Sequence, residues 1–480
     1  MSGRCEGESI YEGYFPSRLG ERLKARNLAE KIENIGKRDV AWSYACTIFT
    51  IGAGVILLPF ILNQMSAETV GIWNIFQTIT ALVMLLDFGF RPSFARNISY
   101  IFAGVKHLQV NGIANVAEHE SDVDYSLLRG TLLAMQKFYR WLAVAMFVVL
   151  ATGGSLYFYY ILQKYTGDRQ DAMIAWILLI AINCYNLYTL YYDALLLGKG
   201  YVKQNQQITI LGQIVYLGTA IALIYSGFGL TAIVSAQLIS TIIRRVLAYR
   251  VFFSKELKKN LSQAQAQDAQ QIFRTIAPNA VKVGMTYLGG FLVNKSALLF
   301  GSAFLSLEQI ACYGITLQVM DVLARCGTVV YQTFIPKLAQ FRAEKDMHQL
   351  QRYYQYAVLS NLVIYLLGGI VWILAGDWAL TIIKSETTFV PIAMLATMLI
   401  ISLLEHNHSI SAGFIMADNK IPFFIPSLVS GAATVLLLWL FLSPLHMGLW
   451  GMILAPGIAQ LVYQNWKWPS VVIKELYATK

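Results

Sequence analysis

The sequence predicts an all-α, polytopic membrane protein with about twelve transmembrane helices. Of its 480 residues, 56% are hydrophobic and only 13% are charged, whereas a soluble domain carries about 25% charged residues. Apolar runs of about 20 residues recur along the whole chain, and each is long enough to cross about 30 Å of hydrocarbon as a helix. The runs are continuously apolar rather than alternating, which favours helices over membrane strands.

The apolar runs form two sets of six. The predicted spans are 39–62, 68–90, 136–162, 172–196, 207–226 and 229–252, then 279–304, 309–336, 353–375, 388–416, 421–443 and 447–466. We therefore expect an N-terminal cytoplasmic segment at 1–38, six-helix bundles at 39–252 and 279–466, a cytoplasmic linker at 253–278 and a cytoplasmic tail at 467–480. Because six is even, both bundles begin on the same side, which predicts a parallel repeat about a two-fold axis along the membrane normal.

A short internal similarity supports this repeat. The segment MSAETVGIWN (65–74) aligns with LSLEQIACYG (305–314) at an offset of 240 residues, with a serine and a glutamate at matching places. Each segment is expected to form the outer turn between the first two helices of its half. Two related bundles with a central cavity between them are the expected result.

The distribution of basic residues predicts the orientation. The net charge is +10, yet only Lys164, Arg169 and Lys384 fall in the expected outer loops. The positive-inside rule then places both termini in the cytoplasm. The rule also explains the positive charge, so we expect no nucleic-acid partner.

Three segments carry a resemblance to a known family. LLDFGFRPSFARNIS (85–99) resembles the Asp-x-Gly-aromatic…Arg signature of polysaccharide and O-antigen (Wzx-type) flippases, in the multidrug/oligosaccharidyl-lipid/polysaccharide (MOP) exporter superfamily. The turn S-x-E-x-V-G-x-W (66–73) and LLLGKGYVKQ (195–204) are similar to segments of that family. The twelve-span plan extends the resemblance over nearly the whole chain.

The resemblance implies a transporter rather than an enzyme. It implies that the chain moves a polyprenyl-diphosphate-linked oligosaccharide from the inner to the outer leaflet of the bacterial inner membrane by alternating access, for surface polysaccharide biosynthesis. Membrane lipids and the polysaccharide polymerase machinery are the other partners it implies.

The eighth predicted span carries a polar stripe. Gln318, Asp321, Arg325, Thr328 and Gln332 are spaced by three and four residues, so they share one helical face. Ionisable groups in a span cost about 2.5–3.5 kcal/mol each and normally face a cavity or a partner. The stripe predicts the lining of a water-filled cavity, and the alternative is a buried helix contact with Asp321 paired to Arg325.

Lys295 in the seventh span is expected within reach of Asp321. Counted from the outer turn at 305, their heights in the membrane differ by roughly 5–10 Å, which a lysine side chain partly covers. Two interpretations carry equal weight: a cation aimed at the substrate diphosphate or at acidic sugars, and a structural ion pair.

The tenth span contains a candidate coupling site. Glu405 and His408 lie three residues apart on one face, and His406 is expected to point elsewhere. A buried carboxylate near a histidine can take up a proton, and coupling to H⁺ or Na⁺ is the expected energy source. The alternative is a hydrogen-bonded polar patch near the inner interface. We expect no metal site and no cofactor.

Asp87, Arg91 and Arg96 lie where the second span meets the cytoplasm. The arginines can meet the diphosphate as substrate arrives from the inner leaflet, because the guanidinium donates hydrogen bonds in pairs. The alternative is anchoring of the arginines to lipid headgroups.

Two other functions remain as alternatives. A cation-coupled multidrug exporter of the same superfamily would need carboxylates for cationic drugs, whereas Lys295 and Arg325 favour an anionic cargo. A membrane-embedded polysaccharide polymerase or ligase usually has a large outer loop, but the expected outer loops are short, and we predict no catalytic residues.

Overall fold

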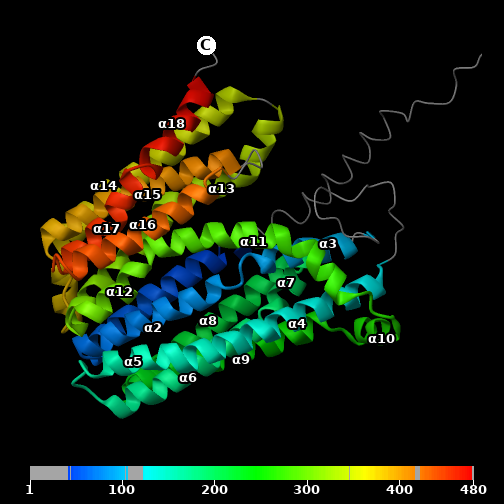
Figure 1. The fold of residues 1–480 in the computed structure, drawn as a ribbon, viewed down its shortest axis with the longest axis horizontal. Helices are drawn as coiled ribbons and strands as arrows, with labels where there is room; N and C mark the ends of the chain where they lie inside the picture. Colours follow the sequence, from blue (N-terminus) through cyan, green and yellow to red (C-terminus); the bar gives the residue numbers. More distant parts are fainter. Residues whose placement is uncertain are drawn as a thin grey trace, which may run out of the picture.

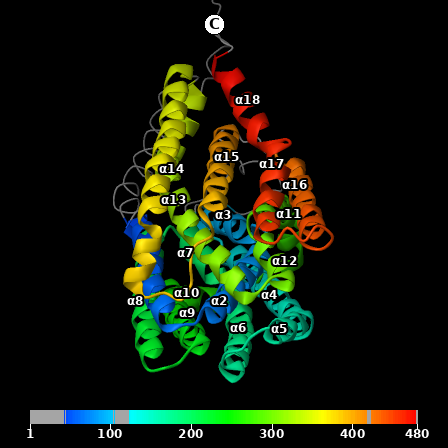
Figure 2. The same cartoon turned by 90° about the vertical axis from the view of Figure 1, so that its left-hand side faces the viewer.

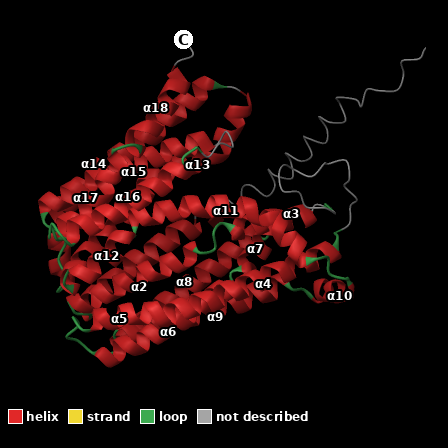
Figure 3. Cartoon of the chain, in the orientation of Figure 1, coloured by secondary structure: helices red, strands yellow, loops and turns green. Residues whose placement is uncertain are grey.

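The computed structural model describes residues 42–43, 45–102, 104–105, 123–344, 346–416 and 422–477. In these ranges every regular element is a helix and none is a strand (Figure 3). The prediction of an all-α polytopic protein is confirmed.

The helices fall into two groups along the chain (Figure 1). The first group comprises the helix Ala45–Gln64, α2 (Ala67–Leu85), α3 (Phe90–Phe102), α4 (Tyr125–Val149), the π-helical turn η2 (Leu150–Gly154), α5 (Ser155–Leu162), α6 (Arg169–Thr189), α7 (Tyr191–Gly198), α8 (Val202–Tyr225), α9 (Leu230–Phe252) and α10 (Lys255–Gln263). The second comprises α11 (Ala269–Asn294), α12 (Ser296–Phe304), α13 (Leu307–Glu344), α14 (Met347–Ile383), α15 (Ile392–Met416), α16 (Phe424–Leu442), α17 (Leu449–Leu461) and α18 (Gln464–Tyr477). We call these groups the N-lobe and the C-lobe.

Eight helices of the described ranges are long and apolar enough to cross a membrane. Six of them coincide with the six spans predicted for the first half, and α14 and α16 coincide with the ninth and eleventh spans. The other four predicted spans are also helical, but two are interrupted: α11 gives way to α12 at Lys295, and α17 to α18 at residues 462–463.

The repeat between the lobes is visible at matching helix starts. Ser66 Oγ accepts a hydrogen bond from the backbone N–H of Thr69 at 3.3 Å, and so caps α2. At the position 240 residues later, Ser306 Oγ accepts from the N–H of Gln309 at 3.3 Å, at the start of α13. A serine oxygen satisfies one of the free N–H groups of a helix start. The helices α2 and α13 therefore begin with the same kind of serine cap.

α2 and α13 pack along each other at equivalent positions. A Cβ built on Gly314 would lie 2.3 Å from Cγ of Asn74, so only glycine fits against this asparagine. Asn74 and Gly314 are also 240 residues apart, which places their contact near the axis that relates the lobes. Gln318 Nε2 strengthens it by donating to Asn74 Oδ1 at 2.7 Å.

The two ends of the molecule differ. At the short-turn end, which carries the turns at 65–66, 163–168, 305–306 and 384–391, the lobes are joined by hydrogen bonds. Lys164 Nζ of the N-lobe donates to three carbonyls at the end of α12 at 2.8–3.3 Å. Asn63 Nδ2 donates to the carbonyl of Ile383 at the end of α14 at 2.7 Å. Both N-lobe side chains therefore satisfy carbonyls that a helix C-terminus leaves free.

At the opposite end, which carries α3, α10 and the start of α11 and which we call the long-loop end, the lobes diverge (Figure 1). Figure 2 shows the molecule from the short-turn end. One apolar cluster includes both lobes near the short turns, for example Ile72 and Ile310. Toward the long-loop end it is replaced by two separate clusters, one with Phe94 in the N-lobe and one with Phe414 in the C-lobe. The start of α11 belongs to the N-lobe cluster, and the same helix packs against α16 of the C-lobe.

The segment 253–278, expected to link the halves, contains α10 and the first turns of α11. α10 packs against α4, and Arg129 Nη1 on α4 donates to the carbonyl of Ala264 at 2.6 Å. The expected tail 467–480 likewise contains most of α18, which packs against α15.

Candidate functional site

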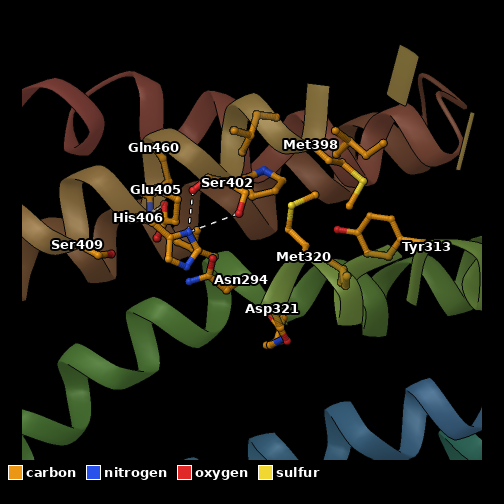
Figure 4. A pocket seen from close by; sticks show the side chains of 16 residues that line it. Asn294, Tyr313, Met320, Asp321, Met398, Ser402, Glu405, His406, Ser409 and Gln460 are labelled. Carbon is orange, nitrogen blue, oxygen red and sulfur yellow. Dashed lines mark hydrogen bonds and ion pairs between the residues drawn. The ribbon is translucent and has the colours of Figure 1, made fainter. Parts of the chain in front are cut away.

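The C-lobe contains a cavity of about 320 Å³, with several polar groups on its wall, between the α11–α12 break and helices α13, α15 and α17 (Figure 4). Its ionisable groups come from Lys295, Tyr313, Asp321, Glu405 and His406, and its amides from Asn294 and Gln460. We call it the C-lobe cavity. In Figure 4, Asp321 lies at the edge nearest the blue helices of the N-lobe, and Glu405 and His406 lie on the opposite wall.

A second cavity, of about 400 Å³, lies between the lobes, and we call it the interlobe cavity. Trp73 and Gln77 line it from the N-lobe, and Gln318, Asp321 and Arg325 line it from α13. Asp321 therefore borders both cavities, because it is also part of the C-lobe cavity wall.

Lys295 and Asp321 form the contact that their spacing predicts. Nζ of Lys295 lies 2.8 Å from Oδ2 of Asp321, and the side chains are 33% and 52% exposed, respectively. Among the described ion pairs none joins Asp321 to Arg325, so the alternative pairing within α13 is not formed. The break in the helix at Lys295, where φ is −127° and ψ is −17°, places its side chain beside α13.

The polar stripe of α13 divides into two parts. Gln318, Asp321 and Arg325 line the interlobe cavity. Thr328 lines neither of the two cavities, and its hydroxyl donates to the carbonyl of Ala324 at 2.9 Å. The side chain of Gln332 lies outside what the structure describes. The first three of the five stripe residues therefore line a cavity, as predicted.

Glu405 lies in a hydrogen-bonded network that links α15, α17 and α18. Its Oε2 accepts from Nε2 of Gln460 at 2.7 Å and lies 3.6 Å from Nδ1 of His408. His408 Nδ1 is 3.1 Å from Oδ1 of Asn465. The Glu405 side chain is 14% exposed, and it also borders a further cavity of about 360 Å³ that His408 and Gln464 line. The predicted pairing of Glu405 with His408 on one face is present.

His406 contacts other residues than Glu405 and His408 do, as expected, although Glu405 and His406 both line the C-lobe cavity. Adjacent helical positions are separated by about 100°, and this cavity wraps far enough around α15 to reach both. His406 Nδ1 lies 3.0 Å from the hydroxyl of Tyr365 and 2.7 Å from the carbonyl of Ser402. Tyr365 comes from α14, a contact that spacing within α15 could not reveal.

Asp87 is buried, whereas Arg91 and Arg96 are exposed. The Asp87 carboxylate accepts from the hydroxyl of Tyr139 at 2.6 Å and from the backbone N–H of Arg91 at 3.1 and 3.2 Å. Positive φ angles at Phe88 and Gly89 interrupt the helical backbone between α2 and α3. Asp87 thus supports the start of α3 from inside, and the two arginines face outward at the long-loop end.

Sequence reasoning missed one buried ion pair in the N-lobe. Arg245 Nη1 lies 2.8 Å from Oδ1 of Asp193, with the side chains 6% and 13% exposed. Both residues fall inside predicted spans, at 172–196 and 229–252, so the cost of ionisable groups in a span was the signal that could have identified them.

No family model matches this sequence, and a search of curated proteins finds no match. The fold is similar to that of solved MATE transporters. An inward-facing conformation of a multidrug resistance MATE family transporter of the MOP superfamily has a TM-score of 0.58 at 14% identity, covering 91% of this chain and 96% of that one. The MATE multidrug transporter DinF-BH has a TM-score of 0.58 at 15% identity, covering 93% and 97%.

An outward-facing conformation of a multidrug resistance MATE family transporter of the MOP superfamily has a TM-score of 0.50 at 16% identity, covering 92% and 97%. At these identities the likeness concerns the fold. The chain therefore has the two-lobe fold of MATE transporters, and it is a membrane protein.

Proposed function

We propose that this chain translocates a polyprenyl-diphosphate-linked oligosaccharide to the outer leaflet of a bacterial inner membrane, as a Wzx-type flippase does. The proposal joins the two-lobe fold with the family signature at residues 85–99. Surface polysaccharide biosynthesis is the process it would serve, with the polymerase machinery as the next step.

The observation that best supports this proposal is a positive charge on the cavity wall that α13 forms. Arg325 lines the interlobe cavity, and no described carboxylate pairs with it. Lys295 borders the adjoining C-lobe cavity and pairs with the partly exposed Asp321, which borders both cavities. A guanidinium on the wall of a cavity between the lobes suits a diphosphate, which offers several oxygens and more than one negative charge.

The arrangement of the lobes supports alternating access with the long-loop end in the cytoplasm. The lobes are held together at the short-turn end and diverge at the other (Figure 1). The inward-facing neighbour has the higher TM-score of the two conformations compared. Both observations agree with the positive-inside orientation, which places both termini in the cytoplasm.

Glu405 and His408 are the proposed coupling site. Their network lies within the C-lobe, between two cavities that can supply water or an ion. Loss or gain of one charge at such a site changes the relative stability of two lobe arrangements. Coupling to H⁺ or to Na⁺ is the proposed source of energy.

A cation-coupled multidrug exporter is the second candidate. The names of the MATE neighbours support it, and so do the carboxylates Asp321 and Glu405 in the C-lobe cavity. A cationic drug would use these carboxylates, whereas an anionic lipid-linked sugar would use Lys295 and Arg325. The two candidates therefore predict opposite effects of removing the positive charge of Arg325.

Complementation of a strain without its own flippase tests the proposal. The wild-type chain should restore surface polysaccharide, and Arg325→Ala should lose it while lipid-linked oligosaccharide accumulates inside. Arg250→Ala is the matched control, because Arg250 is exposed on α9 and lines neither cavity. Normal export by Arg325→Ala at equal abundance, or drug resistance without polysaccharide, would overturn the proposed cargo.

A further inference from the structure

The interlobe cavity has uncharged polar groups on its wall in addition to Arg325. Gln77 on α2, Tyr216 on α8 and Gln318 on α13 supply them, so both lobes contribute. The side chains of Gln77 and Tyr216 form no hydrogen bond with any residue that the structure describes. The amide and the hydroxyl are therefore available to a molecule in the cavity.

The Gln318 amide is fixed in an orientation that leaves its oxygen free. Asn74 Nδ2 donates to the carbonyl of Val70 at 3.0 Å, so Oδ1 is the atom of Asn74 that accepts a hydrogen bond. Gln318 Nε2 is the donor to this Oδ1, at 2.7 Å. The Oε1 atom of Gln318 has no donor among the described residues and can accept a hydrogen bond from a ligand hydroxyl.

The rest of the interlobe cavity wall is mostly apolar. The helix Ala45–Gln64 supplies Ile51, Val55 and Leu58, and α2 supplies the ring of Trp73. Ligand sites commonly combine an apolar wall with a few well-placed hydrogen-bonding groups, in cavities of about 300–1,000 Å³. A sugar ring matches such a wall, because it carries apolar C–H faces as well as hydroxyl groups.

The two charged residues of the wall, Asp321 and Arg325, lie on the long-loop side of Gln318. They follow it by three and seven residues on α13, which begins at the short-turn end. At 1.5 Å per residue this places them roughly 5 and 10 Å farther along the helix axis. The part of the cavity wall nearer the short turns is therefore uncharged.

We propose that Gln77, Tyr216 and Gln318 form a saccharide subsite, which binds the uncharged sugar next to the diphosphate of the cargo. The inference rests on the proposed function, which assigns the diphosphate to Arg325. It adds the orientation of the cargo in the cavity, with the sugar toward the short-turn end and the diphosphate toward the long-loop end.

The charges of the wall explain why the sugar at this subsite is uncharged. Arg325 is the one cation among the residues that line the interlobe cavity, and the diphosphate occupies it. A sugar carboxylate would therefore lose water without gaining a cation, which is unfavourable. The hydroxyls of an uncharged sugar instead replace water at Gln77, Tyr216 and Gln318 by direct hydrogen bonds.

Binding of two short-chain probes to the purified full-length chain in detergent tests the subsite. One probe is geranyl diphosphate linked to glucose, and the other is geranyl diphosphate capped with a methyl group, which has the same charge but no sugar. Wild type should bind the glucose probe about two- to tenfold more tightly, the range for one net hydrogen bond. A probe linked to glucuronic acid should bind no more tightly than the methyl-capped probe.

Variants separate the sugar contacts from the diphosphate contact. Gln77→Leu and Tyr216→Phe should each reduce the preference for the glucose probe and leave the affinity for the methyl-capped probe unchanged. Arg325→Ala should weaken both probes by the same factor and so keep the preference. Gln170→Leu and Tyr159→Phe, at exposed positions outside the cavity, are the matched controls and should behave as wild type.

Equal binding of the glucose and methyl-capped probes by wild type would overturn the subsite, as would a full preference in both Gln77→Leu and Tyr216→Phe. Tyr216→Phe removes only a hydroxyl, so it decides the result if Gln77→Leu lowers the unfolding temperature. Tight binding of the glucuronic acid probe would overturn the uncharged sugar. Loss of the preference in Arg325→Ala would overturn the separate places of sugar and diphosphate.

These results are distinguishable from a failure of the proposed function. If the chain does not restore surface polysaccharide but prefers the glucose probe, and Tyr216→Phe loses that preference, the subsite stands and the export process is wrong. If polysaccharide is restored while wild type binds both probes equally, the export process stands and the subsite is wrong.

Discussion

The two lobes share one plan but place their ionisable groups differently. In the N-lobe, Asp193 and Arg245 are almost fully buried and paired with each other. Asp87 is buried against the hydroxyl of Tyr139. In the C-lobe, Glu405 and Asp321 border cavities of about 320 to 400 Å³ instead.

This difference indicates that the charged groups of the two lobes have different roles. A paired charge in a packed core costs much to disturb and has no room to exchange its partner. A charge on a cavity wall has space beside it for water or for a new partner, even where its own exposed fraction is small, as for Glu405 at 14%. The N-lobe charges are therefore expected to determine stability, and the C-lobe charges to determine transport.

The largest loss of stability is expected for Arg245→Ala. The substitution leaves Asp193 buried without its cation, which costs about 3–5 kcal/mol. Membrane abundance and the unfolding temperature in detergent should both fall, whereas Arg250→Ala on the same helix should leave them unchanged. The double variant Asp193→Leu/Arg245→Met should recover part of the loss, because neither member of the pair is left buried without the other. Normal stability of Arg245→Ala would show that the N-lobe pair is not structural.

A smaller loss is expected for Tyr139→Phe. It removes the 2.6 Å hydrogen bond to the buried Asp87 carboxylate, which costs about 1–3 kcal/mol when the acceptor stays buried. The unfolding temperature should fall by less than in Arg245→Ala. Tyr185→Phe is the control, because Tyr185 lines none of the three cavities and does not contact Asp87. Loss of export in Tyr139→Phe without loss of stability would instead give Asp87 a role in transport.

Lys164→Met should loosen the contact between the lobes at the short-turn end. It removes three hydrogen bonds to α12 carbonyls, and net contributions of about 0.5–1.5 kcal/mol predict a several-fold larger separated population. Spin labels at the exposed positions 170 and 386, with native cysteines replaced, would report the distance between the lobes. Arg169→Met is the control, because Arg169 Nε bonds within the N-lobe to the carbonyl of Tyr165. Identical distance distributions would contradict a role for Lys164 in closure.

The smallest change in stability, with loss of function, is expected for Glu405→Gln. The amide keeps the shape of the side chain and can still form a hydrogen bond with Gln460. The free energy of unfolding should therefore change by less than about 1 kcal/mol. Export should stop at neutral pH, because the site can no longer lose or gain a charge. Glu386→Gln, an exposed acid at the short-turn end, is the control. Export with unchanged pH dependence would remove Glu405 from coupling.

The sequence predicted those parts of the site that depend on spacing along one helix or across one short turn. The stripe on α13 and the proximity of Glu405 to His408 follow from helical periodicity, and the Lys295–Asp321 contact follows from similar depths on either side of the turn at 305.

Partners from distant helices could not be predicted in this way. Tyr365, Gln460 and Asn465 meet the α15 network only through tertiary packing, and Tyr139 reaches Asp87 across 52 residues. The eight long apolar helices of the described residues were predictable because apolar length is a local property. The breaks at Lys295 and at 462–463 were not, since the residues there do not disrupt a helix by themselves.

The central claim is that an anionic lipid-linked sugar crosses the membrane past Arg325, the cation on the α13 wall of the interlobe cavity. Purified protein in liposomes loaded with a polyprenyl-diphosphate-linked oligosaccharide tests it most directly, with exposure of the sugar to an external lectin as the measurement. We expect that wild type exposes the sugar well above protein-free liposomes, that Arg325→Ala does not, and that Arg250→Ala behaves as wild type. Equal exposure by wild type and Arg325→Ala would contradict the claim.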